Sequence, residues 1–194
     1  MLYTTARGQL AWSALVAALA FPEKRVTIFT TSNFINNIFG GFSMSEVERI
    51  VDQLRRAFEG PAWHGESIKE LLADVTAEKA AARPFAGAHS IWELVLHIAA
   101  WEEGVRLRLS GERAELSAEE QWPPITDTSE AAWRDTLASM ERTHSGLCAA
   151  IASLDDERLS KPIVKGMSSV YGTLHGVIQH DLYHAGQIAL LKKA

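Results

Sequence analysis

The sequence predicts an all-α protein built as a four-helix bundle. Three long segments carry apolar residues at the three- and four-residue spacing of one helix face, and a fourth such segment is broken by a loop. The alternating pattern of paired strands is missing, and so is any internal repeat. Because each of the four segments has an apolar face to bury, packing them against one another gives a bundle.

The composition limits the classes of function. The chain has 194 residues, a length that favours one domain with a sizeable core. Its net charge is −5, and it has neither a stretch rich in lysine and arginine nor a nucleic-acid motif, so we expect no DNA or RNA partner. The single cysteine, Cys148, excludes an internal disulfide and a cysteine-based zinc finger. Its place in an apolar helical run favours a buried structural thiol.

Residues 1–43 differ in composition from everything downstream. An apolar run at 10–21 resembles a weak signal peptide, and it is too short to span a bilayer, which takes about 20 apolar residues. Residues 26–42 are rich in Thr, Asn, Phe and Ile and carry hardly a charge. We predict that residues 1–43 are an extension from a mis-assigned start, with an export signal as the alternative. The compact domain then spans 44–194, in a cytoplasmic protein without a membrane partner.

Capping signals place the helices of the first half. Ser45 begins the first long helix within an S-x-x-E capping box, and Gly60-Pro61 ends it. After a loop that reads AWHGES, apolar spacing predicts a short helix over 68–75. Thr76 is expected to cap one further turn.

The second half holds the other long helices. Ser90 begins a helix that contains SIWELVLHIAAW and runs to about Leu109. Residues 112–128 include two adjacent prolines and are predicted to be a long loop, and such loops often cover a site. Ser129 begins the third long helix. The last helix is predicted over 171–192, with its apolar stripe turned inward.

The last helix carries two histidines four positions apart, His180 and His184. Residues at this spacing share one helix face, with Cβ atoms about 5–6 Å apart, so both imidazoles can aim at one metal ion. His97, on an apolar face of the second long helix, is the best candidate for a third ligand. Three imidazoles with an open position suit a catalytic metal. The alternative is three ordinary histidines hydrogen-bonded inside the bundle, and spacing alone leaves both interpretations open.

Glu93 lies one turn before His97 on the same face. It is our candidate catalytic residue, as a proton acceptor or as a group that orients a ligand. The alternative role for Glu93 is that of a capping-box glutamate only. Two other metal classes fit poorly: the H-D-x-x-H at 180–184 lacks the glutamate of zincin proteases, and only 141–144 supplies the E-x-x-H that di-iron bundles need twice.

Two segments, HSIWELVLHIAAWEEGVRLRLSG and LHGVIQHDLYHAGQIALLKKA, resemble the DinB-like (YfiT-like) superfamily. The resemblance covers about 44–194 and includes the WHG of the first loop. It implies an up-down-down-up four-helix bundle and a divalent metal held by His97, His180 and His184. With imidazole ligands we expect zinc or nickel first, and iron or manganese as alternatives.

The resemblance also implies a range of activities. Members of this superfamily include thiol transferases that join a low-molecular-weight thiol to an electrophile, and dimers are common among them. We therefore expect a metal-dependent enzyme with a small-molecule substrate, most simply one that transfers such a thiol to a small electrophile, and a homodimer. Two alternatives stay open: hydrolysis by a metal-bound water with Glu93 as base, and a non-catalytic helical dimer that a metal stabilises.

Overall fold

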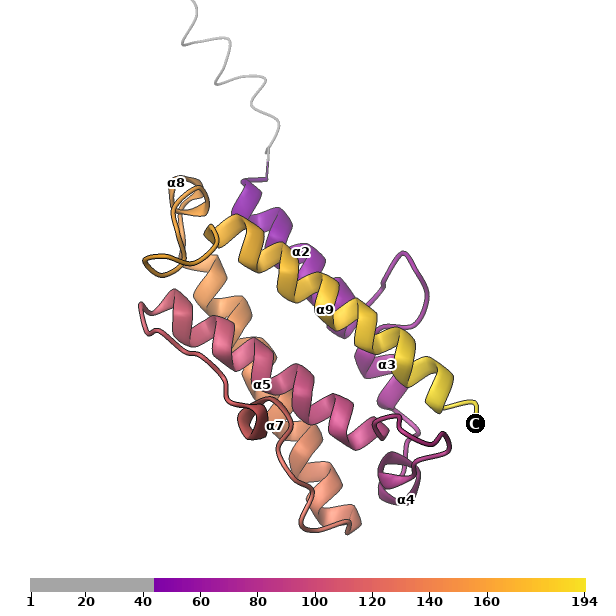
Figure 1. Ribbon diagram of the computed structural model, residues 1–194. Helices are drawn as coiled ribbons and strands as arrows, with labels where there is room; N and C mark the ends of the chain where they lie inside the picture. Colours follow the sequence, from indigo (N-terminus) through magenta and orange to yellow (C-terminus); the bar gives the residue numbers. More distant parts are fainter. Residues whose placement is uncertain (1–43) are drawn as a thin grey trace, which may run out of the picture. The chain divides into compact units, whose positions relative to one another are not determined.

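The computed structural model describes residues 44–194, so the predictions for residues 1–43 lie outside the described part of the chain. Residues 44–194 form helices and contain no strand, which confirms the all-α fold class (Figure 1). The helices are α2 (Glu46–Glu59), α3 (Ile68–Leu72), α4 (Ala77–Ala81), α5 (Ile91–Leu109), α6 (Ala118–Gln121), α7 (Glu130–Ala152), α8 (Asp156–Leu159) and α9 (Val170–Leu191). None of these helices has both the length and the apolar character that a membrane span requires.

The four long helices, α2, α5, α7 and α9, make up the bundle (Figure 1). Their directions follow from which ends share a core. One apolar cluster joins the first halves of α5 and α7 to the end of α9, and a second joins the starts of α2 and α9 to the last turns of α5 and α7. Helices α5 and α7 are therefore parallel to each other and antiparallel to α2 and α9. This is the up-down-down-up order that the resemblance implied.

A serine begins each bundle helix and accepts a hydrogen bond from a backbone N–H of the first turn. The starts predicted at Ser45, Ser90 and Ser129 are confirmed, and so is the cap predicted at Thr76. The last helix begins at Val170, one residue earlier than predicted. Short polar N-caps therefore mark where each bundle helix begins.

The long loop predicted over 112–128 contains one short helical element. Residues Ala118–Gln121 form one helical turn, α6, which begins with a capping box between Ser117 and Glu120. A second turn, α8, follows a cap at Asp155. Both turns are too short to show apolar periodicity, so their capping residues are the only sequence signal that indicates them.

A layer of buried polar side chains separates the two apolar clusters. Glu102 on α5, His144 on α7 and Asp181 on α9 are each at most 1% exposed. Along its own helix, each of these residues is flanked on one side by a residue of the first apolar cluster and on the other side by a residue of the second. The flanking residues are Ile98 and Val105 on α5, Met140 and Leu147 on α7, and Ala185 and Ile178 on α9. The interior thus has a polar level at which α5, α7 and α9 face one another.

Candidate metal centre

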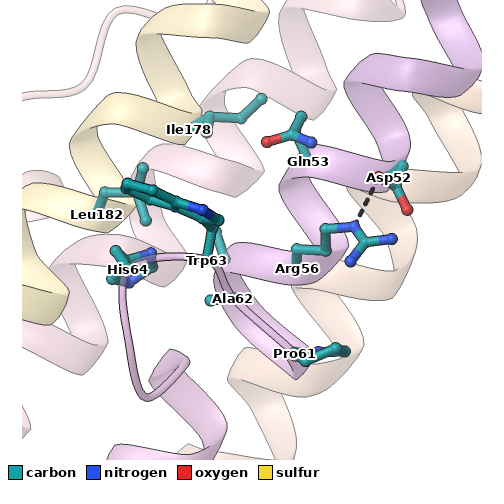
Figure 2. A pocket seen from close by; sticks show the side chains of 10 residues that line it. Asp52, Gln53, Arg56, Pro61, Ala62, Trp63, His64, Ile178 and Leu182 are labelled. Carbon is teal, nitrogen blue, oxygen red and sulfur yellow. Dashed lines mark hydrogen bonds and ion pairs between the residues drawn. The ribbon is translucent and has the colours of Figure 1, made fainter.

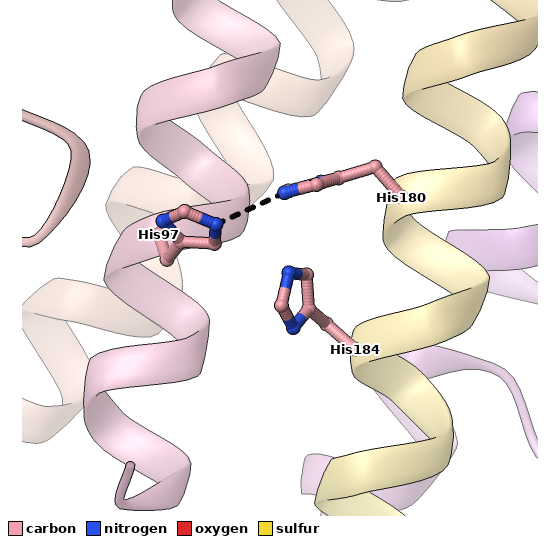
Figure 3. A group of neighbouring side chains, drawn as sticks. All are labelled: His97, His180 and His184. Atoms are coloured by element: carbon pink, nitrogen blue, oxygen red, sulfur yellow. Dashed lines mark hydrogen bonds between the residues drawn. The ribbon is translucent and has the colours of Figure 1, made fainter. Parts of the chain in front are cut away.

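The structure brings together the three histidines that the sequence singled out. His97 projects from α5 toward His180 and His184 on α9, and the three rings face one another (Figure 3). The Nε2 atoms of His97 and His180 are 3.1 Å apart. One ring nitrogen from each of the three residues lies within 4.8 Å of the other two. Among residues 44–194 this is the one group of three or more potential metal-ligating side chains that converges in this way.

The helix faces explain why these rings meet. Helices α5 and α9 bury apolar stripes against each other, and the histidines stand at the edge of those stripes. His97 and His184 are each 6% exposed, whereas His180 is only partly buried. The four-residue spacing of His180 and His184 puts both rings on the side of α9 that faces α5, as predicted.

Each of the three imidazoles has a hydrogen-bond acceptor at Nδ1. The acceptors are the Gln121 carbonyl oxygen for His97 (2.7 Å), Oδ1 of Asp181 for His180 (3.5 Å) and Oε1 of Gln187 for His184 (2.7 Å). An oxygen of this kind only accepts, so we assign the ring proton to Nδ1 in all three residues. The Nε2 lone pairs are then left free and point toward one another. Outer hydrogen bonds to Nδ1 are typical of histidines that ligate a metal through Nε2.

The electrostatics of the cluster favour neutral imidazoles, which can ligate a metal between the rings. Two Nε2 lone pairs that face each other at 3.1 Å repel unless a proton or a metal lies between them. Burial, followed by the mutual effect of the neighbouring rings, lowers the pKa of His180 to about 3. Burial also lowers the pKa values of His97 and His184, which favours the neutral imidazole, the form that ligates a metal.

A divalent metal fits the donor set. Two nitrogens that bind tetrahedral zinc at about 2.0–2.1 Å are about 3.3 Å apart, close to the separation of the two Nε2 atoms. The ligands are neutral imidazoles, which suit several divalent transition metals. In the part of the chain that the structure describes, no fourth side chain joins the group, so three protein ligands would leave an open position.

Aromatic rings surround the histidines on the side of the α5–α7 connection. The Trp122 ring stacks on His97, with centroids 3.8 Å apart and planes 9° apart, and His89 stacks on the other face of Trp122 at 3.6 Å. Trp101 lies with its ring centroid 5.9 Å from that of His180. The connection that was predicted to cover a site therefore lies against His97, through the Gln121 carbonyl and the Trp122 ring.

Glu93 meets this network at His89 and not at the clustered histidines. One carboxylate oxygen accepts the backbone N–H of Ser90 at 2.8 Å in the predicted capping box, and the other pairs with Arg83. Nδ1 of His89 lies 3.7 Å from the Oε2 atom of Glu93. The capping role of Glu93 is thus in place, and its role as a catalytic residue stays a prediction.

The buried polar layer was not predicted from the sequence. Asp181 was noted only as the residue that departs from the protease motif, and Glu102 was not among the candidate residues. A signal was present, because Glu102, His144 and Asp181 all occupy positions of the apolar stripe on their helices, where a charged or polar residue is unexpected. Cys148 was predicted to be buried, and it is 2% exposed.

A large cavity lies elsewhere in the bundle. A hollow of about 970 Å³ lies between α2 and α9, beside the loop after α2. Figure 2 shows the Trp63 ring reaching from this loop toward Ile178 and Leu182, with His64 beside it. None of the three clustered histidines lines this cavity, so it has no direct part in a metal centre.

Comparison with known proteins places the chain in a family. No curated protein and no solved structure matches it. A family model described as the DinB superfamily matches residues 62–188, a range that contains all three clustered histidines. The match spans more than half of the chain, and the protein belongs to the DinB superfamily.

Proposed function

We propose that the protein is a metal-dependent enzyme that transfers a low-molecular-weight thiol to a small electrophile. His97, His180 and His184 would hold a divalent metal, zinc or nickel in the first place. The observation that carries this proposal is the convergence of three Nε2 lone pairs whose Nδ1 atoms are already engaged. When bound, such a metal acts as a Lewis acid that lowers the pKa of a coordinated thiol or water.

The chain's own groups prepare the site for an anionic sulfur. Three neutral imidazoles leave the charge of a divalent ion uncompensated, which favours a negatively charged ligand at the open position. The stacked Trp122 shields His97 from water on one side, and low polarity strengthens electrostatic attraction. The thiol must come from a substrate, because the only cysteine, Cys148, is buried against His144.

Two further expectations belong to this proposal. We infer a homodimer from the resemblance to the superfamily, and light scattering of the purified protein tests it. We infer a cytoplasmic location from the interpretation of residues 1–43 as an extension. Hydrolysis with Glu93 as base is the second candidate activity. Its support is the position of Glu93 one turn from His97, and the Arg83 and Ser90 contacts of the carboxylate weigh against it.

Elemental analysis of the purified protein beside two variants tests the metal site. We expect about one metal ion per chain in the wild type and in His175→Ala, and none in His180→Ala. His175 lies on the same helix and is outside the converging group, so it controls for the loss of an imidazole from α9.

Turnover then tests the activity. The wild type is assayed with a panel of thiols and a chromogenic electrophile, before and after removal of the metal. Full turnover by metal-free protein would rule out the proposal. Glu93→Gln separates the two activities, because it should slow hydrolysis and leave thiol transfer unchanged.

A further inference from the structure

Two fully buried carboxyl groups lie in contact with each other, and one of them contacts a histidine of the proposed metal centre. Glu102 comes from α5 and Asp181 from α9, the two helices that carry the histidines, and each side chain is 0% exposed. The two carboxyl groups are within hydrogen-bonding reach of each other. Oε2 of Glu102 and Oδ2 of Asp181 have no other partner among the described residues. Buried oxygens without a partner are rare enough to need a physical explanation.

The other oxygen of each carboxyl group contacts a histidine. Oε1 of Glu102 lies 2.8 Å from Nδ1 of His144, and Oδ1 of Asp181 lies 3.5 Å from Nδ1 of His180. On its far side His144 contacts the Cys148 sulfur, 3.4 Å from Nε2. A continuous line of polar contacts therefore runs from the interior of α7, through both carboxyl groups, to a histidine of the proposed metal centre.

One shared proton accounts for this arrangement. Two ionised carboxylates in contact would repel each other strongly inside the protein, whereas a single proton between them bonds both otherwise unpaired oxygens. Each outer oxygen then remains free to accept an N–H from its histidine.

We propose that Glu102 and Asp181 are positioning residues of the metal centre, which act together to hold the His180 ring with Nε2 toward His97 and His184. Glu102 acts through Asp181, and Asp181 acts on Nδ1 of His180. The proposal rests on the metal site proposed above. It depends on the hydrogen bonds of the pair and holds whichever carboxyl group carries the proton.

The same residues do not form a second metal site. Glu102, His144, Cys148 and Asp181 are all ligand types, but among residues 44–194 no three of their ligand atoms converge as those of the three histidines do. The contact between His144 and Glu102 is that of a hydrogen bond, at 2.8 Å. The line of contacts therefore supports a neighbouring site and does not bind an ion of its own.

Two substitutions of Glu102 separate hydrogen bonding from packing. In Glu102→Gln the amide still donates to Asp181 and accepts from His144, so the zinc Kd should stay within about threefold of the wild type. In Glu102→Leu the volume is similar and both bonds are lost, so zinc binding should weaken by about 10- to 100-fold. The Kd is measured by competition with a chromophoric chelator, on protein shown to be folded by circular dichroism. Glu102→Met serves if the leucine variant does not fold.

Trp133→Phe is the matched control for general destabilisation. It removes another buried hydrogen bond, 2.7 Å from the Trp133 ring nitrogen to the Val75 carbonyl oxygen, within the apolar cluster. This variant should melt at a lower temperature and bind zinc like the wild type. Equal weakening in Trp133→Phe and Glu102→Leu, or a Glu102→Leu Kd within about threefold of the wild type, would overturn the positioning role. A wild-type protein that binds neither zinc nor nickel would instead overturn the proposed function.

Discussion

Gln187→Met is expected to weaken zinc binding through His184. Oε1 of Gln187 accepts the Nδ1–H of His184 at 2.7 Å, and His184 is 6% exposed. Methionine has a similar length and only a weak acceptor, so the bond is lost with little change in packing. Without metal, the imidazole can move its proton to Nε2. Metal binding forces the proton back to Nδ1, where the buried N–H then has no partner.

The size of the effect follows from that unpartnered donor. A buried polar group without a hydrogen bond costs about 1–3 kcal/mol. Because the penalty falls on the metal-bound form, and 1.4 kcal/mol is a factor of ten in Kd, zinc binding should weaken by about 5- to 150-fold. Gln187→Glu should act in the opposite direction, because a carboxylate accepts the same N–H with added charge and makes the imidazole a stronger ligand.

Competition with a chromophoric chelator at neutral pH measures both variants. Gln179→Met is the control, since Gln179 is an exposed residue of the same helix and should bind zinc like the wild type. Gln187 does not orient His184 if the methionine variant binds zinc within about twofold of the wild type, or if Gln187→Met and Gln187→Glu shift the Kd in the same direction.

Two further predictions concern the protein without metal. Trp122→Ala removes the ring that stacks on both His97 and His89, and at about 0.5–1.5 kcal/mol for each stacked pair it should lower the free energy of unfolding by about 1–3 kcal/mol. Urea denaturation checks this, and an unchanged midpoint would show that the stack contributes nothing. The stability of the metal-free protein should fall as the pH drops from about 6.5 toward 3, because the folded pKa of His180 is about 3 and the unfolded chain binds more protons in that window. Urea denaturation at pH 7.5 and pH 5 tests the sign, and equal stability at both values would contradict it.

Most of the fold could be predicted because its signals are local. The Ser45 and Ser90 capping boxes and the apolar stripes lie within single helices, where a three- or four-residue period is visible in one sequence. The α6 turn escaped prediction because four residues cannot show such a period. The directions of the helices came from the resemblance, since nothing local determines whether α5 and α7 are parallel.

In the candidate metal centre, too, the features that could be predicted are those with a signal inside a single helix. His180 and His184 share one helix face, so their convergence follows from spacing, and His97 was identified by its place on an apolar face. The Gln121 carbonyl oxygen that engages His97 belongs to the backbone and lies 24 residues away. Its position depends on the path of a loop, and side-chain chemistry in the sequence does not report on backbone acceptors.

The contact between Glu102 and Asp181 depends on how α5 and α9 are rotated against each other, which no single helix determines. That contact also gives a physical reason to expect function at this level of the bundle. A helical bundle gains stability by filling its interior with apolar side chains, and buried polar groups contribute only when every partner is present. Here the apolar interior is interrupted on three helices at once, next to three imidazoles whose Nε2 lone pairs converge. Local rules of packing are broken most often where a protein binds or reacts. Because the polar layer joins the two helices that carry the histidines, orienting a metal ligand explains its position better than bundle stability does.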